Sequence, residues 1–401
     1  MLQPVIERVV RESYGRLVAY LASRSRDVQL VEDALSEALI VALKEWPVQG
    51  VPDSPEAWLL TVARRRLVDA RRKADREEVA WQGVAEMMRS AETVRQEGEF
   101  PDERVKLLFV CAHPALDESV RAPLMLSLLF GLTAEEIAGS FLVSSATMGQ
   151  RLVRAKQRIQ GLKLKFDVPE GDRLEERLGS VLDAIYVAYG VSWEEPRESV
   201  RGLGEEALQM AEIVVRMFPE EGEGKGLLAL ILYLKSRDRA RRDEWGQYVP
   251  LSEQVVDLWD RELILKAENE LKSAVRLGKL GRFQWEASIQ SVHASRLWTG
   301  ATDWGSLCVL YDELMHLHCS AGVCVGRAAA RGEAFGAREG LRCLAELDEV
   351  ELQGYQPYWA TKGHLLEQAG ERDEARNCYQ MAIQMAGNEA VREWLRRRLE
   401  S

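Results

Sequence analysis

Residues 132–159 read LTAEEIAGSFLVSSATMGQRLVRAKQRI, and they carry the strongest local signal in the N-terminal part of the chain. Thr133 and Glu136 have the spacing of a capping box at the start of one helix. Ser144 or Ser145 can cap a second helix, which has an apolar face (Met148, Leu152, Ala155, Ile159) and a polar, basic face (Thr147, Arg151, Arg154, Arg158). The stretch therefore predicts a helix-turn-helix, whose second helix can lie in the major groove of DNA.

The charge of the chain supports this interpretation once it is divided along the sequence. The net charge is −11, but residues 1–166 carry 24 basic and 23 acidic side chains, whereas residues 167–401 carry 29 and 41. Residues 64–76 hold seven bases and two acids, and residues 144–165 hold six bases and no acid. An ordinary helical hairpin with a solvated face is the alternative for the second run, and the complete lack of acids disfavours it.

Apolar residues recur at helical spacing nearly everywhere, and no series of alternating strands is found, so we predict an all-α fold. The apolar stripe of residues 35–46 predicts a helix that we expect to end at Pro47. The next helix is predicted to begin between residues 53 and 55 and to reach about Val79, and residues 82–99 are predicted to be a linker. A second helical block is expected at residues 100–165.

After residue 166 the chain becomes acidic, with Trp-containing helical segments joined by Gly-bearing turns. Its clearest unit resembles a tetratricopeptide repeat, in which one helix has a large, a small and a large residue and the next helix a small, a large and a small one. The residues at these positions are Trp359, Gly363 and Leu366, followed by Ala375, Tyr379 and Ala382. Less regular helix pairs around residues 263–297 and 307–347 predict a degenerate helical-repeat array.

The sequence favours a soluble cytoplasmic protein without catalytic chemistry. The longest apolar run, residues 227–234, is too short to cross a membrane, and the charged start has no signal-peptide pattern. We predict no catalytic residue, no cofactor and no metal. His316, His318, Cys319 and Cys324 are the nearest approach to a zinc site, but their spacing is unconventional and packed, reduced thiols are the expected alternative. We likewise expect Cys111 and His113 to serve packing.

Several segments together resemble a known family. VEDALSEALIVALKEWP (31–47), PEAWLLTVARRRLVDARRK (55–73), FPDERVKLLFVCAHPAL (100–116) and the helix-turn-helix resemble the extracytoplasmic-function (ECF) sigma factors of bacterial RNA polymerase. LWDRELILKAENEL (258–271), GRFQWEASIQSVHA (281–294) and LYDELM (310–315) are similar to the subgroup that carries a tetratricopeptide-like C-terminal extension. The resemblance covers essentially the whole chain.

The resemblance implies a division into domains and a set of partners. Residues 1–80 correspond to sigma region 2, 81–99 to a linker, 100–166 to the region 4 helix-turn-helix, and 167–401 to the extension. The implied partners are core RNA polymerase, through the clamp helices of its largest subunit and its flap, promoter DNA, and a protein partner of the extension. No membrane is involved, and the protein is expected at the nucleoid when it is bound to polymerase.

The resemblance also assigns residues to three surfaces. Asp33, Glu37 and Trp46 match the surface that binds core polymerase. The surface for the minus-ten element comprises Asp53, Trp58, Arg65, Arg66, Asp69, Arg72 and Lys73. The reader of the minus-35 element comprises Ser145, Thr147, Gln150, Arg151, Arg154 and Lys156. Gly149 in the reading helix, Gly190 to Trp193 and residues 324–331 depart from the family pattern.

Two other classes of function stay open at this point. A helical-repeat scaffold would use its N-terminal helices to bind protein only, and a stand-alone helix-turn-helix regulator would bind DNA without polymerase. The role of the acidic extension is equally open: it either masks the basic helices or offers a groove to a partner.

Overall fold

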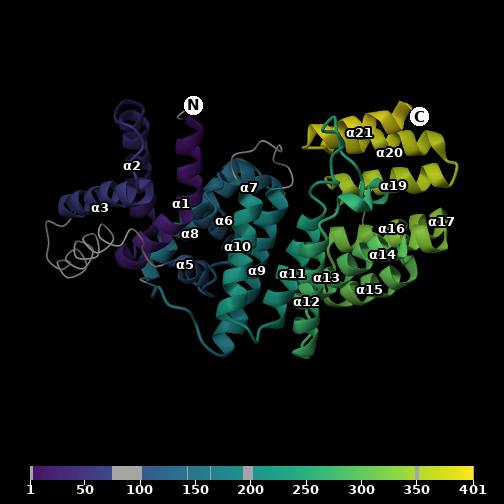
Figure 1. Ribbon diagram of the computed structural model, residues 1–401, viewed down its shortest axis with the longest axis horizontal. Helices are drawn as coiled ribbons and strands as arrows, with labels where there is room; N and C mark the ends of the chain where they lie inside the picture. Colours follow the sequence, from purple (N-terminus) through teal and green to yellow (C-terminus); the bar gives the residue numbers. More distant parts are fainter. Residues whose placement is uncertain are drawn as a thin grey trace. The chain divides into compact units, whose positions relative to one another are not determined.

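The computed structural model describes residues 3–74, 102–141, 143–162, 164–192, 202–347 and 352–400, with the backbone alone at 3–12, 71–74 and 400. Within these residues the secondary structure is helical, apart from one isolated bridge between Arg242 and Tyr248 (Figure 1). The predicted all-α class is confirmed. The linker predicted at residues 82–99 and the predicted helix end near Val79 lie outside the described residues.

The chain divides into two compact units, Met1–Met210 and Ala211–Ser401. The helices of the first unit are α1 (Gln3–Ser25), α2 (Val28–Gln49), α3 (Pro55–Ala74), α5 (Arg104–Cys111), α6 (Glu118–Leu129), α7 (Ala134–Ser140), α8 (Ser145–Leu162) and α9 (Asp172–Ser192). The boundary falls within α10 (Leu203–Met217).

The second unit is also built of helices. They are α11 (Gly222–Ser236), α12 (Arg261–Arg276), α13 (Arg282–Ala294), α14 (Arg296–Thr299), α15 (Trp304–Leu317), α16 (Ala321–Phe335), α17 (Ala337–Ala345), α19 (Gln356–Gln368), α20 (Arg372–Met385) and α21 (Glu389–Glu400). Two short 3-10 turns, η1 (Leu251–Glu253) and η2 (Val256–Leu258), precede α12.

The helix predicted to end at Pro47 continues to Gln49, so that expectation was wrong. Pro47 lies in the last turn of α2, where its missing N–H removes only one hydrogen bond from the end of the helix. Gly50 ends the helix instead. Its φ of 89° is one that glycine adopts without strain, and its N–H donates to the carbonyl of Trp46 at 3.0 Å. α3 begins at Pro55, within the predicted interval.

The first unit continues past residue 166, where the sequence suggested a domain boundary. α9 is amphipathic, and its buried face, including Leu178, Val181 and Ile185, packs on α6. α1 also packs on α6, so closely that a Cβ atom at Gly15 would collide with the carbonyl oxygen of Leu129. One core therefore joins the first helices of the chain to the helices around the predicted helix-turn-helix.

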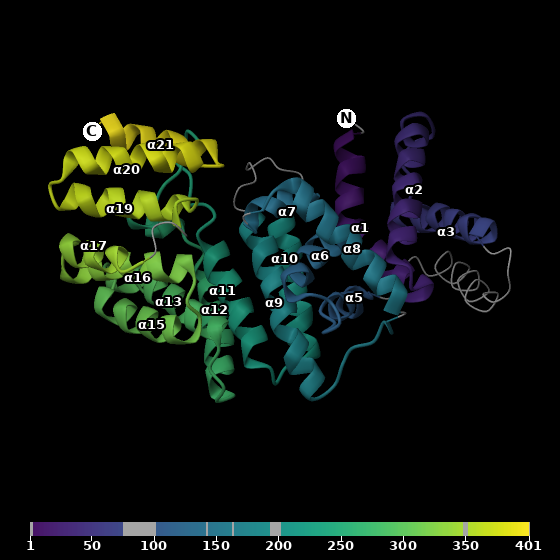
Figure 2. The ribbon, with the colours of Figure 1, turned by 180° about the vertical axis from the view of Figure 1, so that it is seen from behind.

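In the second unit, helices that follow one another along the chain pack on each other. α11 packs on both α12 and α13, α15 packs on α16, and α19 packs on α20, and the last pair lies beside α21 in both ribbon views (Figures 1 and 2). Gly363 makes room for Tyr379: a Cβ atom at Gly363 would lie 2.9 Å from the Cε1 atom of Tyr379. The small and large residues of the predicted repeat therefore fit together across α19 and α20.

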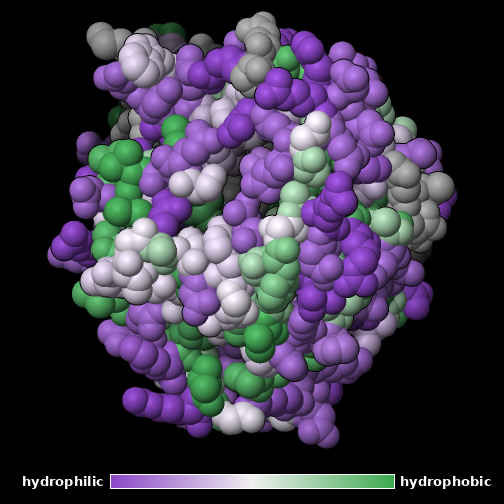
Figure 3. All heavy atoms as spheres, turned by 90° about the vertical axis from the view of Figure 1, so that its right-hand side faces the viewer, coloured by the Kyte–Doolittle hydropathy of each residue, from purple (hydrophilic) through white to green (hydrophobic). Residues whose placement is uncertain are grey.

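On the face of the molecule seen in Figure 3, most side chains are hydrophilic, and hydrophobic side chains form several patches among them. Cys111, Cys308, Cys324, Cys343 and Cys378 are buried, as expected of packed thiols, whereas Cys319 is exposed. No group of three or more metal-ligating side chains is present among residues the structure describes. None of the helices described is both long and apolar enough to cross a membrane.

Candidate nucleic-acid interface

The predicted helix-turn-helix is formed by α7 and α8. Thr133 and Glu136 make the predicted capping box: the Thr133 N–H donates to the Glu136 carboxylate at 2.8 Å, and the Glu136 N–H donates to the Thr133 hydroxyl at 3.3 Å. Ile137 and Ala138 are buried. Ser144 caps α8, because its Oγ accepts the Thr147 N–H at 3.2 Å. Local sequence signals therefore account for both helix starts.

α8 has the two faces that its sequence predicts. Met148, Leu152, Ala155 and Ile159 are buried. Ser145, Thr147, Gln150 and Arg154 are exposed, and Arg151 is half-buried. Gly149 needs no special conformation or close approach, since a Cβ atom there would make only an ordinary contact, 3.9 Å from Ala134. The exposed face presents a hydroxyl, an amide and guanidinium groups, which are the donors that read base edges and phosphates.

Lys156 behaves differently from the other predicted reader residues. Its Nζ atom lies 2.8 Å from the Oε1 atom of Glu32 on α2, and both side chains are nearly buried, at 12% and 13% exposure. One turn further along α8, Gln160 donates to the Oδ2 atom of Asp27 at 2.8 Å. Asp27 is also the N-cap of α2, where its Oδ1 atom accepts the Leu30 N–H at 3.0 Å.

This contact between α2 and α8 leaves one charged atom incompletely paired. The Oε2 atom of Glu32 is buried and has no hydrogen-bond partner among the described residues. Burial raises the pKa of Glu32, against the opposing influence of Lys156. A buried oxygen without a hydrogen-bond partner reduces stability by about 1–3 kcal/mol. The ion pair therefore stabilises the contact between α2 and α8 less than a fully hydrogen-bonded pair would.

Trp58 is positioned by Trp46. Trp46, on α2, is 1% exposed, and its ring meets that of Trp58 on α3 edge-on, with centroids 5.4 Å apart and planes at 65°. Trp58 is half-buried. The indole of Trp46 thus belongs to the core of the unit, whereas part of Trp58 faces outward beside the loop of residues 50–54, in which Asp53 is exposed.

The basic run on α3 divides into exposed and buried members. Arg65, Arg66 and Asp69 are exposed. The Arg66 Nε atom lies 3.3 Å from the Oε2 atom of Glu37 on α2, but both side chains are about half exposed, so the pair contributes little stability. Arg72 and Lys73 lie in the last turn of α3, and their side chains are outside the described part.

Arg64 is the member of this run whose role the sequence analysis missed. It is buried and donates to the hydroxyl of Tyr20 at 2.7 Å, and this burial lowers the pKa of its guanidinium. The helical spacing of Leu60, Arg64 and Leu67 is the signal that could have placed Arg64 on the apolar face.

The predicted polymerase contacts Asp33 and Glu37 are exposed on α2. Asp33 accepts a hydrogen bond of 3.3 Å from Gln29, one turn earlier on the same face. The first unit thus brings exposed acidic groups on α2, exposed basic groups on α3 and the polar face of α8 onto one compact body. The predicted members that do not join these exposed surfaces are Trp46 and Lys156.

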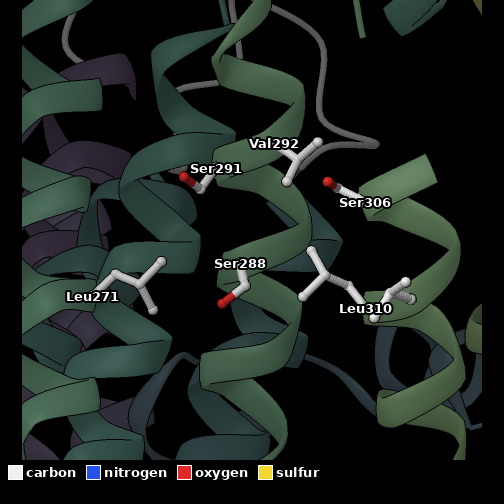
Figure 4. Close-up of a pocket in the computed structure, with 7 residues that line it drawn as sticks. Leu271, Ser288, Ser291, Val292, Ser306 and Leu310 are labelled. Carbon is white, nitrogen blue, oxygen red and sulfur yellow. The ribbon is translucent and has the colours of Figure 1, made fainter. Parts of the chain in front are cut away.

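The second unit has a groove of about 430 Å³ along α12, α13 and α15, lined by Leu271, Ser288, Ser291, Val292, Ser306, Val309 and Leu310. Figure 4 shows Ser288 and Ser291 on α13, between Leu271 and Leu310. Ser291 and Tyr233 both donate to the carboxylate of Glu268. Burial alone would raise the pKa of Glu268, but these two hydrogen bonds and Lys272 lower it.

Comparison with known proteins identifies both parts of the first unit. Residues 9–77 match the family model for sigma-70 region 2, and residues 106–159 match the model for sigma-70 region 4. Residues 177–275 match a family of unknown function, DUF6596. An uncharacterized protein of Rhizobium meliloti (strain 1021) is 34% identical over 399 residues, which cover 97% of this chain and 93% of that protein.

The region 2 match includes α2 and α3, and the region 4 match includes most of α8, so the matched regions contain the exposed surfaces described above. Because region 2 and region 4 are both matched, in that order along the chain, the protein belongs to the sigma-70 family of sigma factors.

Proposed function

We propose that the protein is an ECF sigma factor that binds core RNA polymerase and directs it to a specific set of promoters. The observation that carries this proposal is the polar, basic face of α8 on a helix-turn-helix, in the same compact unit as the region 2 helices α2 and α3. The protein directs initiation and leaves the chemistry of RNA synthesis to polymerase.

In this proposal three surfaces bind polymerase, the minus-ten element and the minus-35 element. Asp33 and Glu37 on α2 contact the clamp helices of polymerase, and Trp46 acts from the core by holding Trp58. The minus-ten surface comprises Asp53, Trp58, Arg65, Arg66, Asp69, Arg72 and Lys73. Trp58 offers an aromatic ring to a base that leaves the stack, and the basic residues accompany the strand that is opened.

The minus-35 surface comprises Ser145, Thr147, Gln150, Arg151 and Arg154 on α8, and Lys156 joins it when it leaves Glu32. Side chains near the start of the helix are suited to base edges, and the arginines to guanine or phosphates. The region 4 surface also meets the flap of polymerase in this proposal.

The distance between promoter elements indicates that the first unit opens during initiation. Trp46 and Glu32 are 14 residues apart on α2, so α3 and α8 touch α2 at points about 21 Å apart along its axis. Elements named for positions −10 and −35 are about 25 base pairs apart, or about 85 Å of duplex. We infer that α8 leaves α2 when both elements are read, and that binding to core polymerase drives this separation.

The C-terminal unit is proposed to regulate this activity or to bind a protein partner. Its support is the array of stacked helix pairs, in which the α19 and α20 pair has the small and large residues of a tetratricopeptide-like repeat.

Binding to labelled DNA tests the proposal against the two other classes. The DNA is a fragment from upstream of the protein's own gene, and fluorescence anisotropy is measured with and without bacterial core polymerase. A sigma factor binds it tightly only with core polymerase present. A stand-alone regulator binds equally well without polymerase, and a scaffold ignores the DNA under both conditions.

A further inference from the structure

Two cysteines meet at the connection between α15 and α16. Ser320 is the N-cap of α16, and its side chain accepts the Val323 N–H. Cys319 therefore occupies the position before the cap, and Cys324 the fourth position of the helix. Side chains at these two positions commonly pack on each other at helix starts and fix the angle at which the chain enters the helix.

The Sγ atoms of Cys319 and Cys324 lie 3.5 Å apart. Cys319 is exposed, whereas Cys324 is 8% exposed. Burial, together with the contact to the Cys319 thiol, raises the pKa of Cys324 to about 11. The pair thus combines a thiol that reagents in water can reach with a protonated thiol directly behind it.

We propose that Cys319 and Cys324 form a dithiol that hydroperoxides oxidise to an intramolecular disulfide. The Cys319 thiolate attacks one peroxide oxygen and becomes a sulfenic acid, while the other oxygen leaves and is protonated to water or an alcohol. The Cys324 sulfur then attacks the Cys319 sulfur, loses its proton and displaces hydroxide, which leaves as water. The peroxide is reduced by two electrons, and the two thiols are oxidised to one disulfide.

The geometry makes this pair the site of oxidation among the six cysteines. A disulfide has a sulfur–sulfur distance of about 2.05 Å, so the two sulfur atoms must approach by about 1.5 Å, a movement that rotation of the exposed Cys319 side chain can supply. The remaining cysteines, Cys111, Cys308, Cys343 and Cys378, are buried, and Cys319 is the exposed thiol.

The bond would fix the first turn of α16 to the segment that precedes it. That helix also carries Arg327 and Arg331, which both pair with Asp312 on α15, at 2.5 and 2.8 Å. Oxidation would therefore change the rigidity of the α15–α16 pair within the second unit. The inference does not rest on the proposed function of the first unit.

The test is a mass measurement on the full-length protein. The reduced protein is treated with hydrogen peroxide, denatured, alkylated with iodoacetamide and cut with trypsin. Residues 297–327 form one tryptic peptide that contains Cys308, Cys319 and Cys324. We expect this peptide to carry one alkyl group, on Cys308, instead of three, and to weigh about 2 Da less than expected for free thiols at the other two positions.

Two variants separate the proposal from unrelated oxidation. Cys308→Ser should leave the disulfide unchanged. Cys324→Ser should prevent it and leave a sulfenic acid on Cys319, which dimedone traps. Three alkyl groups on the peptide after peroxide would overturn the proposal, and so would a disulfide that joins two chains or pairs Cys308 with either thiol.

Discussion

Lys156 on α8 and Glu32 on α2 form a nearly buried ion pair, with the Nζ and Oε1 atoms 2.8 Å apart. The family resemblance assigns Lys156 to the DNA-reading surface, yet in this structure its ammonium group is engaged within the protein. Because α3 packs on the other end of the same helix, α2 holds both proposed DNA-binding helices close together. This pair is therefore the most informative place to perturb the first unit.

Removal of one partner should loosen the contact between α2 and α8. Lys156→Met leaves the Glu32 carboxylate buried without its cation, which we expect to destabilise the contact by about 1–3 kcal/mol. Amide hydrogen exchange in α8 should accelerate between about 5-fold and 150-fold, and mass spectrometry of α8 peptides measures this rate.

Two further variants control that experiment. Adding Glu32→Leu to Lys156→Met removes the unpaired charge and should slow exchange again, whereas Arg158→Met changes an exposed basic residue of the same helix and should have little effect. Equal exchange rates in the wild type and Lys156→Met would show that the ion pair does not hold α8.

Arg154 should contact a phosphate or a base through its exposed guanidinium. Arg154→Ala is expected to weaken promoter binding by the complex with core polymerase and to reduce the slope of log K against log salt by about one. Gln157→Ala, an exposed uncharged position on the same helix, is the control and should leave the slope unchanged. An unaltered slope for Arg154→Ala would place Arg154 outside the interface.

Local patterns predicted much of this architecture, because helix caps and amphipathic faces depend on residues close together in sequence. The capping box at Thr133 and the buried stripe of α8 both agree with the sequence. Lys156 and Glu32 are 124 residues apart along the chain, so local sequence patterns could not predict that they pair. Pro47 misled the prediction because a proline in the last turn removes only one hydrogen bond.

Among the site residues, too, local patterns predicted the exposed faces but not the contacts made by tertiary packing. The sequence correctly indicated which face of α8 is polar, whereas the burial of Trp46 and Arg64 depends on their packing against Trp58 and Tyr20. Charge and aromatic character alone do not distinguish a binding residue from one that serves the core.

Gly363 should tolerate no larger residue. In Gly363→Ala the new methyl group would lie 2.9 Å from the Tyr379 ring and 3.3 Å from the carbonyl oxygen of Ala375, so α19 and α20 must move apart. We expect a loss of about 1–3 kcal/mol, measured as a lower urea midpoint. Gly354→Ala is the control, since a Cβ atom there meets nothing within 4 Å. A midpoint for Gly363→Ala equal to that of the control would contradict this packing.

His293 should make the second unit sensitive to mild acid. Burial, with Arg237 and Arg296 nearby, lowers the pKa of His293 to about 3, whereas an unfolded histidine has a pKa of about 6.5. Above pH 6.5 the imidazole is neutral in both states and its contribution is fully present. As the pH falls from 6.5 toward 3 the unfolded state binds the proton more readily, so stability is lost.

The measurement compares urea midpoints of the wild type and His293→Gln between pH 7 and pH 5, where carboxylates remain ionised. The wild type should lose up to about 1.4 kcal/mol more per pH unit than the variant over the lower part of this range. Parallel midpoints for the two proteins would contradict the burial of a neutral imidazole.

We expect this protein to confer promoter specificity on RNA polymerase, and reconstituted transcription measures this activity. Purified full-length protein and bacterial core polymerase are combined on fragments from upstream of the protein's own gene, and run-off RNA is measured. We expect a discrete transcript that requires the protein and is diminished by Arg154→Ala. Failure of the protein to bind core polymerase, with no such transcript, would contradict a sigma factor function.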